Sequence, residues 1–154
     1  MENSKVNILY VDDEANNLHS FKATFRIKYN VFVALSGDEA IKILAEQPIE
    51  VIITDQRMPG MTGVEFLESI IPDHPDPMRI LLTGYADMTA VVDAINKGKI
   101  FHYLTKPWKE EELDGTIQKA IAVYNEKMEE REKVTDLSVS NTQLEFLLRQ
   151  KLLS

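Results

Sequence analysis

Cysteine is absent from this sequence of 154 residues, which excludes disulfides and thiolate metal sites. The absence fits a reducing compartment such as the cytoplasm. No apolar run approaches the roughly 18–20 residues that a membrane-spanning helix needs. The N-terminal segment MENSKVNILY also lacks a signal-peptide pattern, because its apolar stretch is short and leads straight into acidic residues. Together these absences predict a cytoplasmic protein with no membrane segment.

Positive charge is scarce as well. The sequence has 17 Lys and Arg against 25 Asp and Glu, for a net charge of −8. This balance argues against general binding to nucleic acid or to an anionic membrane, since both need clustered basic side chains. Hydrophobic residues make up 44% of the chain, enough for a globular domain to bury a core. We predict one domain over residues 1–125 and a distinct C-terminal segment over residues 126–154.

Short apolar runs alternate with amphipathic stretches over the first 125 residues. The runs are rich in Val, Ile and Leu, which is typical of parallel strands covered on both faces. The expected strands are Val6–Val11, Val31–Leu35, Ile49–Thr54, Met78–Thr83 and Ile100–Leu104. The expected helices are Asn16–Lys28, Asp38–Glu46, Gly63–Ile70, Asp87–Lys97 and a last one from Glu110 onward. Five strand–helix units in succession predict an α/β fold with an open, doubly wound sheet.

Three helix ends carry recognisable signals. Ser36 with Glu39, and Thr62 with Glu65, have the spacing of capping boxes. Gly98 is placed to end the fourth helix in a left-handed conformation.

Reactive side chains follow four of the five expected strands. Function gathers outside the carboxyl ends of the strands in such sheets, at the point where the strand order reverses. If the strand order is 2-1-3-4-5, these four ends are neighbours. They carry Asp12 and Asp13 after the first strand, Asp55 after the third, Thr83 as the last residue of the fourth with Gly84 following it, and Lys106 after the fifth.

The carboxylates at this edge need a cation. Like charges repel, and partial burial makes ionised carboxylates costlier still. Three carboxylates suit Mg²⁺, which prefers one or two of them together with water and phosphate oxygens. Lys106 and Thr83 supply a charge and a hydroxyl suited to phosphoryl oxygens. Asp55 is the best candidate for a carboxylate nucleophile that forms an aspartyl phosphate.

The segments VDDE, TDQRMPGMTG, LLTGYAD and YLTKPW, in this order and spacing, resemble the receiver domain of bacterial two-component response regulators, in the CheY-like superfamily. The resemblance covers roughly Lys5 to Asn125. It implies a flavodoxin-like five-stranded parallel sheet in the order 2-1-3-4-5. It also implies a signalling switch that takes a phosphoryl group from a sensor histidine kinase or a phosphotransfer protein. Such a domain catalyses only its own phosphorylation and dephosphorylation.

The resemblance assigns the acidic residues to acceptor and metal roles. Asp55 would be the phosphoacceptor and a Mg²⁺ ligand. Asp13 would bind Mg²⁺ directly and Asp12 largely through water. The backbone carbonyl of Arg57 would complete the protein's ligands.

It assigns the remaining residues to the phosphoryl group and the switch. Lys106 would pair with the phosphoryl group, and its bond to Pro107 would be cis. Thr83 and Tyr103 would be the switch pair, reshaping the face of helix four, strand five and helix five. Gly84, beside the phosphoryl group, would leave the acceptor accessible.

Three other classes of protein compete with this interpretation. A flavin- or nucleotide-binding protein of similar topology would use a phosphate loop of backbone amides, whereas the loop here is acidic. An aspartyl-phosphate hydrolase of the haloacid-dehalogenase type has a DxDx[TV] run at its first strand, and VDDEAN is not that. A receiver used only as an unphosphorylated interaction scaffold is the remaining alternative.

The segment after Tyr124 has two interpretations. Val134, Asn141 and Leu148 fit heptad a positions, and Leu137 and Leu144 fit d positions. This pattern predicts a short coiled coil and a homodimer, in which an Asn at a can fix the register. An ordinary amphipathic helix, or a linker to an output domain beyond Ser154, fits nearly as well.

Overall fold

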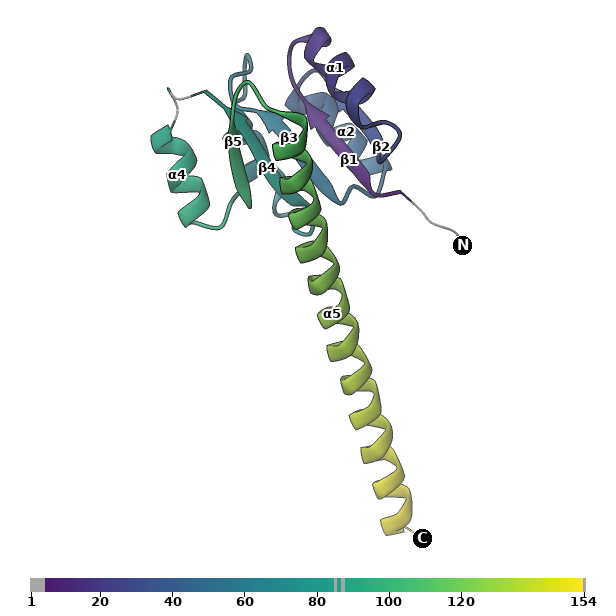
Figure 1. The fold of residues 1–154 in the computed structure, drawn as a ribbon. Helices are drawn as coiled ribbons and strands as arrows, with labels where there is room; N and C mark the ends of the chain where they lie inside the picture. The colour runs from purple at the N-terminus through teal and green to yellow at the C-terminus, as the bar shows by residue number, and fades with distance from the viewer. Residues whose placement is uncertain (1–4, 85, 87, 154) are drawn as a thin grey trace. The chain divides into compact units, whose positions relative to one another are not determined.

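Five parallel strands form a single sheet in the order β2-β1-β3-β4-β5, as predicted (Figure 1). The protein is described here by a computed structural model, which covers residues 5–84, 86 and 88–153, without the side chains of residues 135–142 and 150–153. The strands are β1 (Asn7–Val11), β2 (Asn30–Ala34), β3 (Val51–Asp55), β4 (Met78–Thr83) and β5 (His102–Thr105). The fold is therefore the flavodoxin-like α/β architecture.

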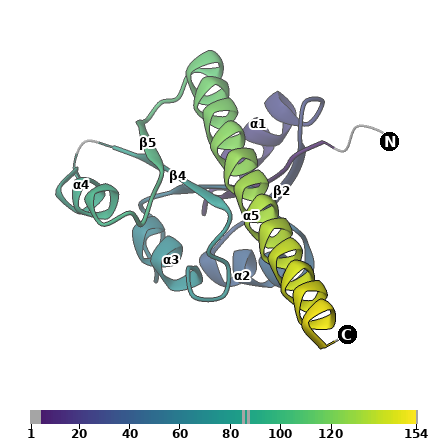
Figure 2. The same ribbon diagram turned by 90° about the horizontal axis from the view of Figure 1, so that it is seen from below.

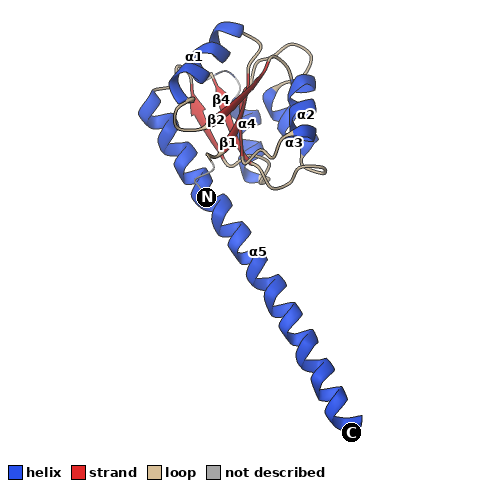
Figure 3. Cartoon of the chain, turned by 90° about the vertical axis from the view of Figure 1, so that its right-hand side faces the viewer, coloured by secondary structure: helices blue, strands red, loops and turns tan. Residues whose placement is uncertain are grey.

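Helices cover both faces of the sheet. They are α1 (Ala15–Phe25), α2 (Gly37–Glu46), α3 (Gly63–Ile70), α4 (Met88–Asn96) and α5 (Glu110–Leu153). Figures 2 and 3 show α1 and the first turns of α5 on one face, and α2, α3 and α4 on the other. Within the described part of the chain, no helix is both long and apolar enough to cross a membrane.

The side chains of β1 alternate between the two faces of the sheet, so this strand packs against the helices on both sides. Leu9 and Val11 belong to the hydrophobic cluster that α2, α3 and α4 complete. Tyr10 points to the opposite face, where its ring stacks on Phe21 of α1. Successive strand side chains point to opposite faces, so a strand buried on both sides is apolar throughout, and this explains the continuous runs in the sequence.

Several element boundaries differ from those predicted. The strands expected from the sequence included Val6, Leu35, Ile49 and Ile100, but these four residues lie outside the observed strands. Ile49 and Ile100 are nevertheless buried. Burial produces the apolar run, whereas strand limits depend on the ladder of hydrogen bonds, so the two need not coincide.

Helix limits differ in a similar way. α1 ends at Phe25, because the segment up to Lys28, predicted as helical, forms a turn in which the Tyr29 amide donates to the Phe25 carbonyl. The predicted start of the fourth helix at Asp87 lies outside the described residues, and the described helix begins at Met88.

The capping signals are largely confirmed. Thr62 and Glu65 form both bonds of a capping box at α3. At α2, the Ser36 side chain accepts from the Glu39 amide, but the Glu39 carboxylate accepts from the amide of Leu35 instead of that of Ser36. The capping box predicted at Ser36 and Glu39 is therefore only half formed. Gly98 has a φ of 73°, the left-handed conformation predicted after α4.

The chain divides into two compact units, Met1–Ile121 and Ala122–Ser154. The first unit contains the sheet and the helices packed on it. The second consists of the later part of α5 and contains no strand among its described residues.

Candidate functional site

Strand register brings the predicted residues to one edge of the sheet. Val11 of β1 pairs with Thr54 of β3, so the residues that follow them, Asp12 and Asp55, lie side by side. Thr83 of β4 pairs with Thr105 of β5, which places Lys106 at the same edge. The convergence predicted from the strand order is therefore present.

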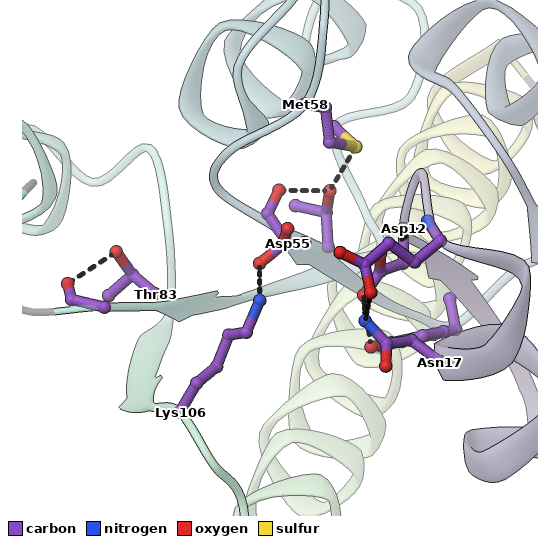
Figure 4. Close-up of polar contacts among 10 residues, drawn as sticks. Asp12, Asn17, Asp55, Met58, Thr83 and Lys106 are labelled. Atoms are coloured by element: carbon purple, nitrogen blue, oxygen red, sulfur yellow. Dashed lines mark hydrogen bonds and ion pairs between the residues drawn. The ribbon is translucent and has the colours of Figure 1, made fainter.

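Three carboxylates meet at this edge. One oxygen from each of Asp12, Asp13 and Asp55 lies within 4.8 Å of the others. Asp12 and Asp55 are buried, with 1% and 5% of their surfaces exposed, whereas Asp13 is exposed. The ammonium of Lys106 lies 2.7 Å from Oδ1 of Asp55 and forms an ion pair with it (Figure 4). The buried carboxylate of Asp55 is thus paired with one cation and flanked by two more anions.

The electrostatics of the site favour an added cation. Burial raises the pKa of Asp55, and the charges of Asp12 and Asp13 raise it further, while Lys106 acts in the opposite direction. Burial by itself would lower the pKa of Lys106, but the hydrogen bond and charge of Asp55 outweigh it, so that pKa is raised. One ammonium does not balance three carboxylates, so a divalent cation would relieve the remaining repulsion.

The donor set fits Mg²⁺. Carboxylate oxygens are hard ligands of the kind this ion takes in proteins, and three of them stand close enough to share one ion. Asp12, Asp13 and Asp55 could therefore hold it. Arg57 is exposed in the loop after β3, and the metal role of its backbone carbonyl stays a prediction.

The residues predicted to form the switch lie close by but apart from the ion pair. Thr83 is fully buried, and its hydroxyl donates to the carbonyl of Gly84 at 3.0 Å (Figure 4). Gly84 has open space where a side chain would stand. Tyr103 is half-buried and packs against the hydrophobic cluster on the α2–α4 face. The switch role of Thr83 and Tyr103 stays a prediction, as does the place of Gly84 beside the phosphoryl group.

A pocket opens beside the acidic residues. Its volume is about 260 Å³, and it is lined by Tyr10, Asp12, Asn17, Ser20, Lys106, Pro107 and Trp108. The peptide bond between Lys106 and Pro107 is cis. Because Asp12, Lys106 and Trp108 line the same pocket, the indole of Trp108 is a natural reporter of events at the site.

Three residues that the sequence did not single out support this edge. Tyr10 and Asn17 both donate to Asp12. Gln56 closes the loop after β3, because its carbonyl accepts from the Gly63 amide and its side chain accepts from the Val64 amide. The contact between Tyr10 and Asp12 could have been predicted from the sequence, since residues two apart along a strand share a face. The partners of Gln56, Gly63 and Val64, follow it by seven and eight residues, a spacing that predicts no such contact.

A model of the response regulator receiver domain family matches residues 8–118. The hydrogenase transcriptional regulatory protein HoxA of Cupriavidus necator is 36% identical over 121 residues, covering 79% of this chain and 25% of that protein. The DNA-binding transcriptional regulator NtrC of Salmonella typhimurium is 35% identical over 96 residues, covering 62% of this chain and 20% of that protein. This chain therefore spans a quarter or less of the length of these two relatives.

Solved structures show the same likeness. A response regulator receiver domain protein from Clostridium thermocellum superposes with a TM-score of 0.74 at 33% identity, covering 78% of this chain and 97% of that one. A structure described as adenylate cyclase from Rhodopirellula baltica superposes with a TM-score of 0.82 at 31% identity, covering 85% of this chain and 98% of that one.

Proposed function

The chain belongs to the response regulator receiver domain family, and from that membership we propose that it is a phosphorylation switch whose acceptor is Asp55. The donor is a phosphohistidine on a sensor histidine kinase or a phosphotransfer protein. One observation carries this proposal: the buried carboxylate of Asp55, ion-paired to Lys106 at 2.7 Å, stands beside Asp12 and Asp13. The direct test is whether Mg²⁺ and a small phosphodonor add one phosphoryl group at Asp55.

The chemical step is a transfer onto a carboxylate oxygen. An oxygen of Asp55 attacks phosphorus and forms the new O–P bond. The P–N bond of the donor breaks, and its electron pair leaves with the imidazole. Lys106 already contacts Oδ1 of Asp55, so its ammonium is placed to follow the phosphoryl oxygens and to balance their charge.

Asp12, Asp13 and Asp55 would hold Mg²⁺ for this step, together with the backbone carbonyl of Arg57. The ion would neutralise charge on the phosphoryl oxygens during transfer. Asp12 has little freedom, since it is buried and already hydrogen-bonded. Asp13 is exposed and can turn to the ion, which supports direct ligation by Asp13 and contact through water by Asp12.

Phosphorylation is then read through Thr83 and Tyr103. The Thr83 hydroxyl donates to the carbonyl of Gly84, and a phosphoryl group on Asp55 offers it a charged acceptor. A hydrogen bond to a charged oxygen is stronger than one to a carbonyl, so the hydroxyl turns toward it. Tyr103 then moves inward into the space that the Thr83 hydroxyl has left. This movement changes the face formed by α4, β5 and the start of α5. That face regulates a partner or an output domain.

The domain is not a turnover enzyme. Its site promotes only the arrival and loss of its own phosphoryl group. The open space at Gly84 leaves Asp55 accessible to the donor and to water. A scaffold controlled by partner binding alone would have no use for the Asp55–Lys106 pair, and it would remain unlabelled by a phosphodonor.

We expect Asp13→Ala to weaken Mg²⁺ binding by more than about 10-fold, because even residues that only orient a metal ligand are worth about that much. The variant removes a direct ligand and one charge from the site. Trp108 lines the pocket together with Asp12 and Lys106, so titration of its fluorescence measures the affinity.

Asp73→Ala is the matched control, since Asp73 is also an exposed carboxylate but lies in the turn after α3. It should titrate like the wild-type protein. A titration curve of Asp13→Ala that overlays the wild-type curve contradicts this cation site.

We propose further that the C-terminal part of α5 pairs with a second copy of the chain. Val134, Leu144 and Leu148 are 63%, 58% and 56% exposed, so burying them against a partner helix is favourable. The side chains of Leu137 and Asn141, which complete the predicted heptads, lie outside the described residues. Phosphorylation shifts this pairing through the face at the start of α5, with a coupling of about 1–3 kcal/mol.

Sedimentation velocity tests the pairing. The full chain is expected to be dimeric, and a chain that ends at Asn125 is expected to be monomeric, with beryllofluoride altering only the former. Leu144→Glu should dissociate the dimer, because it places a charge in the apolar seam, whereas Gln143→Glu adds the same charge at a neighbouring exposed position. A full chain that stays monomeric at high concentration, with and without beryllofluoride, rules the dimer out.

A further inference from the structure

The buried carboxylate of Asp12 is held by three donors. The hydroxyl of Tyr10 donates to Oδ2 at 2.9 Å, and the side-chain amide of Asn17 donates to the same oxygen at 3.1 Å. The backbone amide of Glu14 donates to Oδ1 at 3.0 Å. Figure 4 shows Asp12 and Asn17 beside the Asp55–Lys106 pair. The orientation of this carboxylate is therefore set before any cation arrives.

Among these donors, Tyr10 is the one fixed by the core. Its side chain is only 2% exposed, and its ring stacks on that of Phe21, with 4.2 Å between centroids and 2° between planes. Phe21 is itself fully buried and contacts Phe25 and Trp108. The phenol ring cannot swing aside without disturbing this aromatic cluster, so packing determines where its hydroxyl lies.

Asn17, by contrast, has alternatives. Its side chain is half-buried, and the same amide nitrogen lies 3.4 Å from the carboxylate of Glu14. An amide shared between two acceptors near solvent specifies an orientation less strictly than a hydroxyl locked in the core.

We propose that Tyr10 is a positioning residue for the cation site, which holds the Asp12 carboxylate in the orientation that a divalent cation and its water require. The inference rests on the proposed function, because it concerns the same cation. Groups that hydrogen-bond to metal ligands typically change metal affinity by about 10-fold to 100-fold when they are removed. Tyr10 stands in that relation to Asp12, and it is placed there by the alternation of β1.

A purely structural role is the competing explanation, and the chain contains a matched control for it. Tyr29 is 3% exposed, packs against Phe25, and donates its hydroxyl to Oδ1 of Asp114 at 2.5 Å. It also accepts from the side chain of Gln118 at 2.7 Å. Each tyrosine thus joins a buried ring to a carboxylate, but Asp114 lies on α5, outside the acidic cluster.

The experiment compares the full-length wild-type chain with Tyr10→Phe and Tyr29→Phe. Both variants keep the ring and remove one hydroxyl, and differential scanning calorimetry shows what each loses in stability. Isothermal titration calorimetry with MgCl₂ measures the dissociation constant of each protein. We expect Tyr10→Phe to raise that constant about 10-fold and Tyr29→Phe to leave it within twofold of wild type.

A dissociation constant of Tyr10→Phe within twofold of wild type, with the wild-type protein binding Mg²⁺, overturns this inference and leaves the proposed function standing. An equal rise in both variants also overturns it, because the effect would then follow from general loosening of the fold. A wild-type protein that binds no Mg²⁺ overturns the cation-dependent function and this inference together.

Discussion

Replacing Asp55 with asparagine is expected to abolish covalent labelling of the chain by acetyl phosphate and Mg²⁺. The wild-type protein should gain one phosphoryl group, stable in acid and labile in base, as expected of an acyl phosphate. An amide oxygen is no comparable nucleophile, so the Asn variant has nothing with which to displace acetate. The asparagine is close in size to Asp55, so the fold is retained. Intact-mass spectrometry measures the label directly.

Asp114→Asn is the matched control for this experiment. Asp114 is also a partly buried carboxylate bonded to a lysine, Lys28, and to the hydroxyl of Tyr29. It lies outside the acidic cluster, so its substitution should leave the labelling unchanged. Equal labelling of wild type and Asp55→Asn would place the acceptor elsewhere and remove the basis of the proposed switch.

The architecture was predictable because β-strands buried on both faces have a distinctive composition. Strand β3 (Val51–Asp55) is buried along its whole length, so its sequence shows an apolar run, Val51–Ile53, that leads to the carboxylate of Asp55. Repetition of such runs with amphipathic helices between them restricts the topology strongly. The order of strands did not follow from the runs themselves. It followed from the resemblance, and the structure confirms it.

The strand limits were less predictable, for a physical reason visible at Ile100. This residue is 4% exposed and belongs to the core cluster, yet β5 begins at His102. Burial of an apolar side chain is favourable whether or not its backbone forms the hydrogen bonds of the sheet. His102 itself is exposed but lies within the strand. Hydrophobicity alone would therefore include Ile100, which lies outside the strand, and omit His102, which lies inside it.

The supporting residues of the site were harder to find than the acidic residues. Asp12, Asp13 and Asp55 are visible in the sequence as charges at the ends of apolar strands. Tyr10 acts through a hydroxyl that packing against Phe21 holds in place, and Gln56 acts through contacts with the first residues of α3. Tyr10 is apolar enough to be taken as core, which it also is, and only the structure shows its hydroxyl directed at Asp12.

Gly63→Ala is expected to destabilise the domain by about 3 kcal/mol, within the range known for overpacked cores. A methyl group built at Gly63 would stand 2.4 Å from the backbone carbonyl oxygen of Asp55 and 2.8 Å from a methyl of Leu81. The first contact is with backbone at the end of a central strand, which cannot move aside as a flexible side chain would. The glycine is therefore required by the close approach of α3 to β3.

The same contact ties stability to function. Any relaxation around the added methyl group pushes on the peptide group of Asp55, and the Asp55 carboxylate would shift away from Lys106, 2.7 Å distant in the native structure. We therefore expect slower labelling by acetyl phosphate as well as a thermal midpoint lowered by about 10 °C. Thermal unfolding and the rate of labelling should change together.

Gly115→Ala provides the control with the opposite sign. Gly115 lies in α5 with nothing within 4 Å of the added methyl group. Alanine there reduces the conformational entropy of the unfolded chain and favours the helix, so we expect stabilisation by roughly 0.5–1 kcal/mol. If Gly63→Ala proved as stable as wild type, or changed stability in the same direction as Gly115→Ala, then α3 would not pack against β3 as closely as the 2.4 Å approach at Gly63 implies. The positioning of Asp55 would then have to come from Lys106 and the acidic cluster alone.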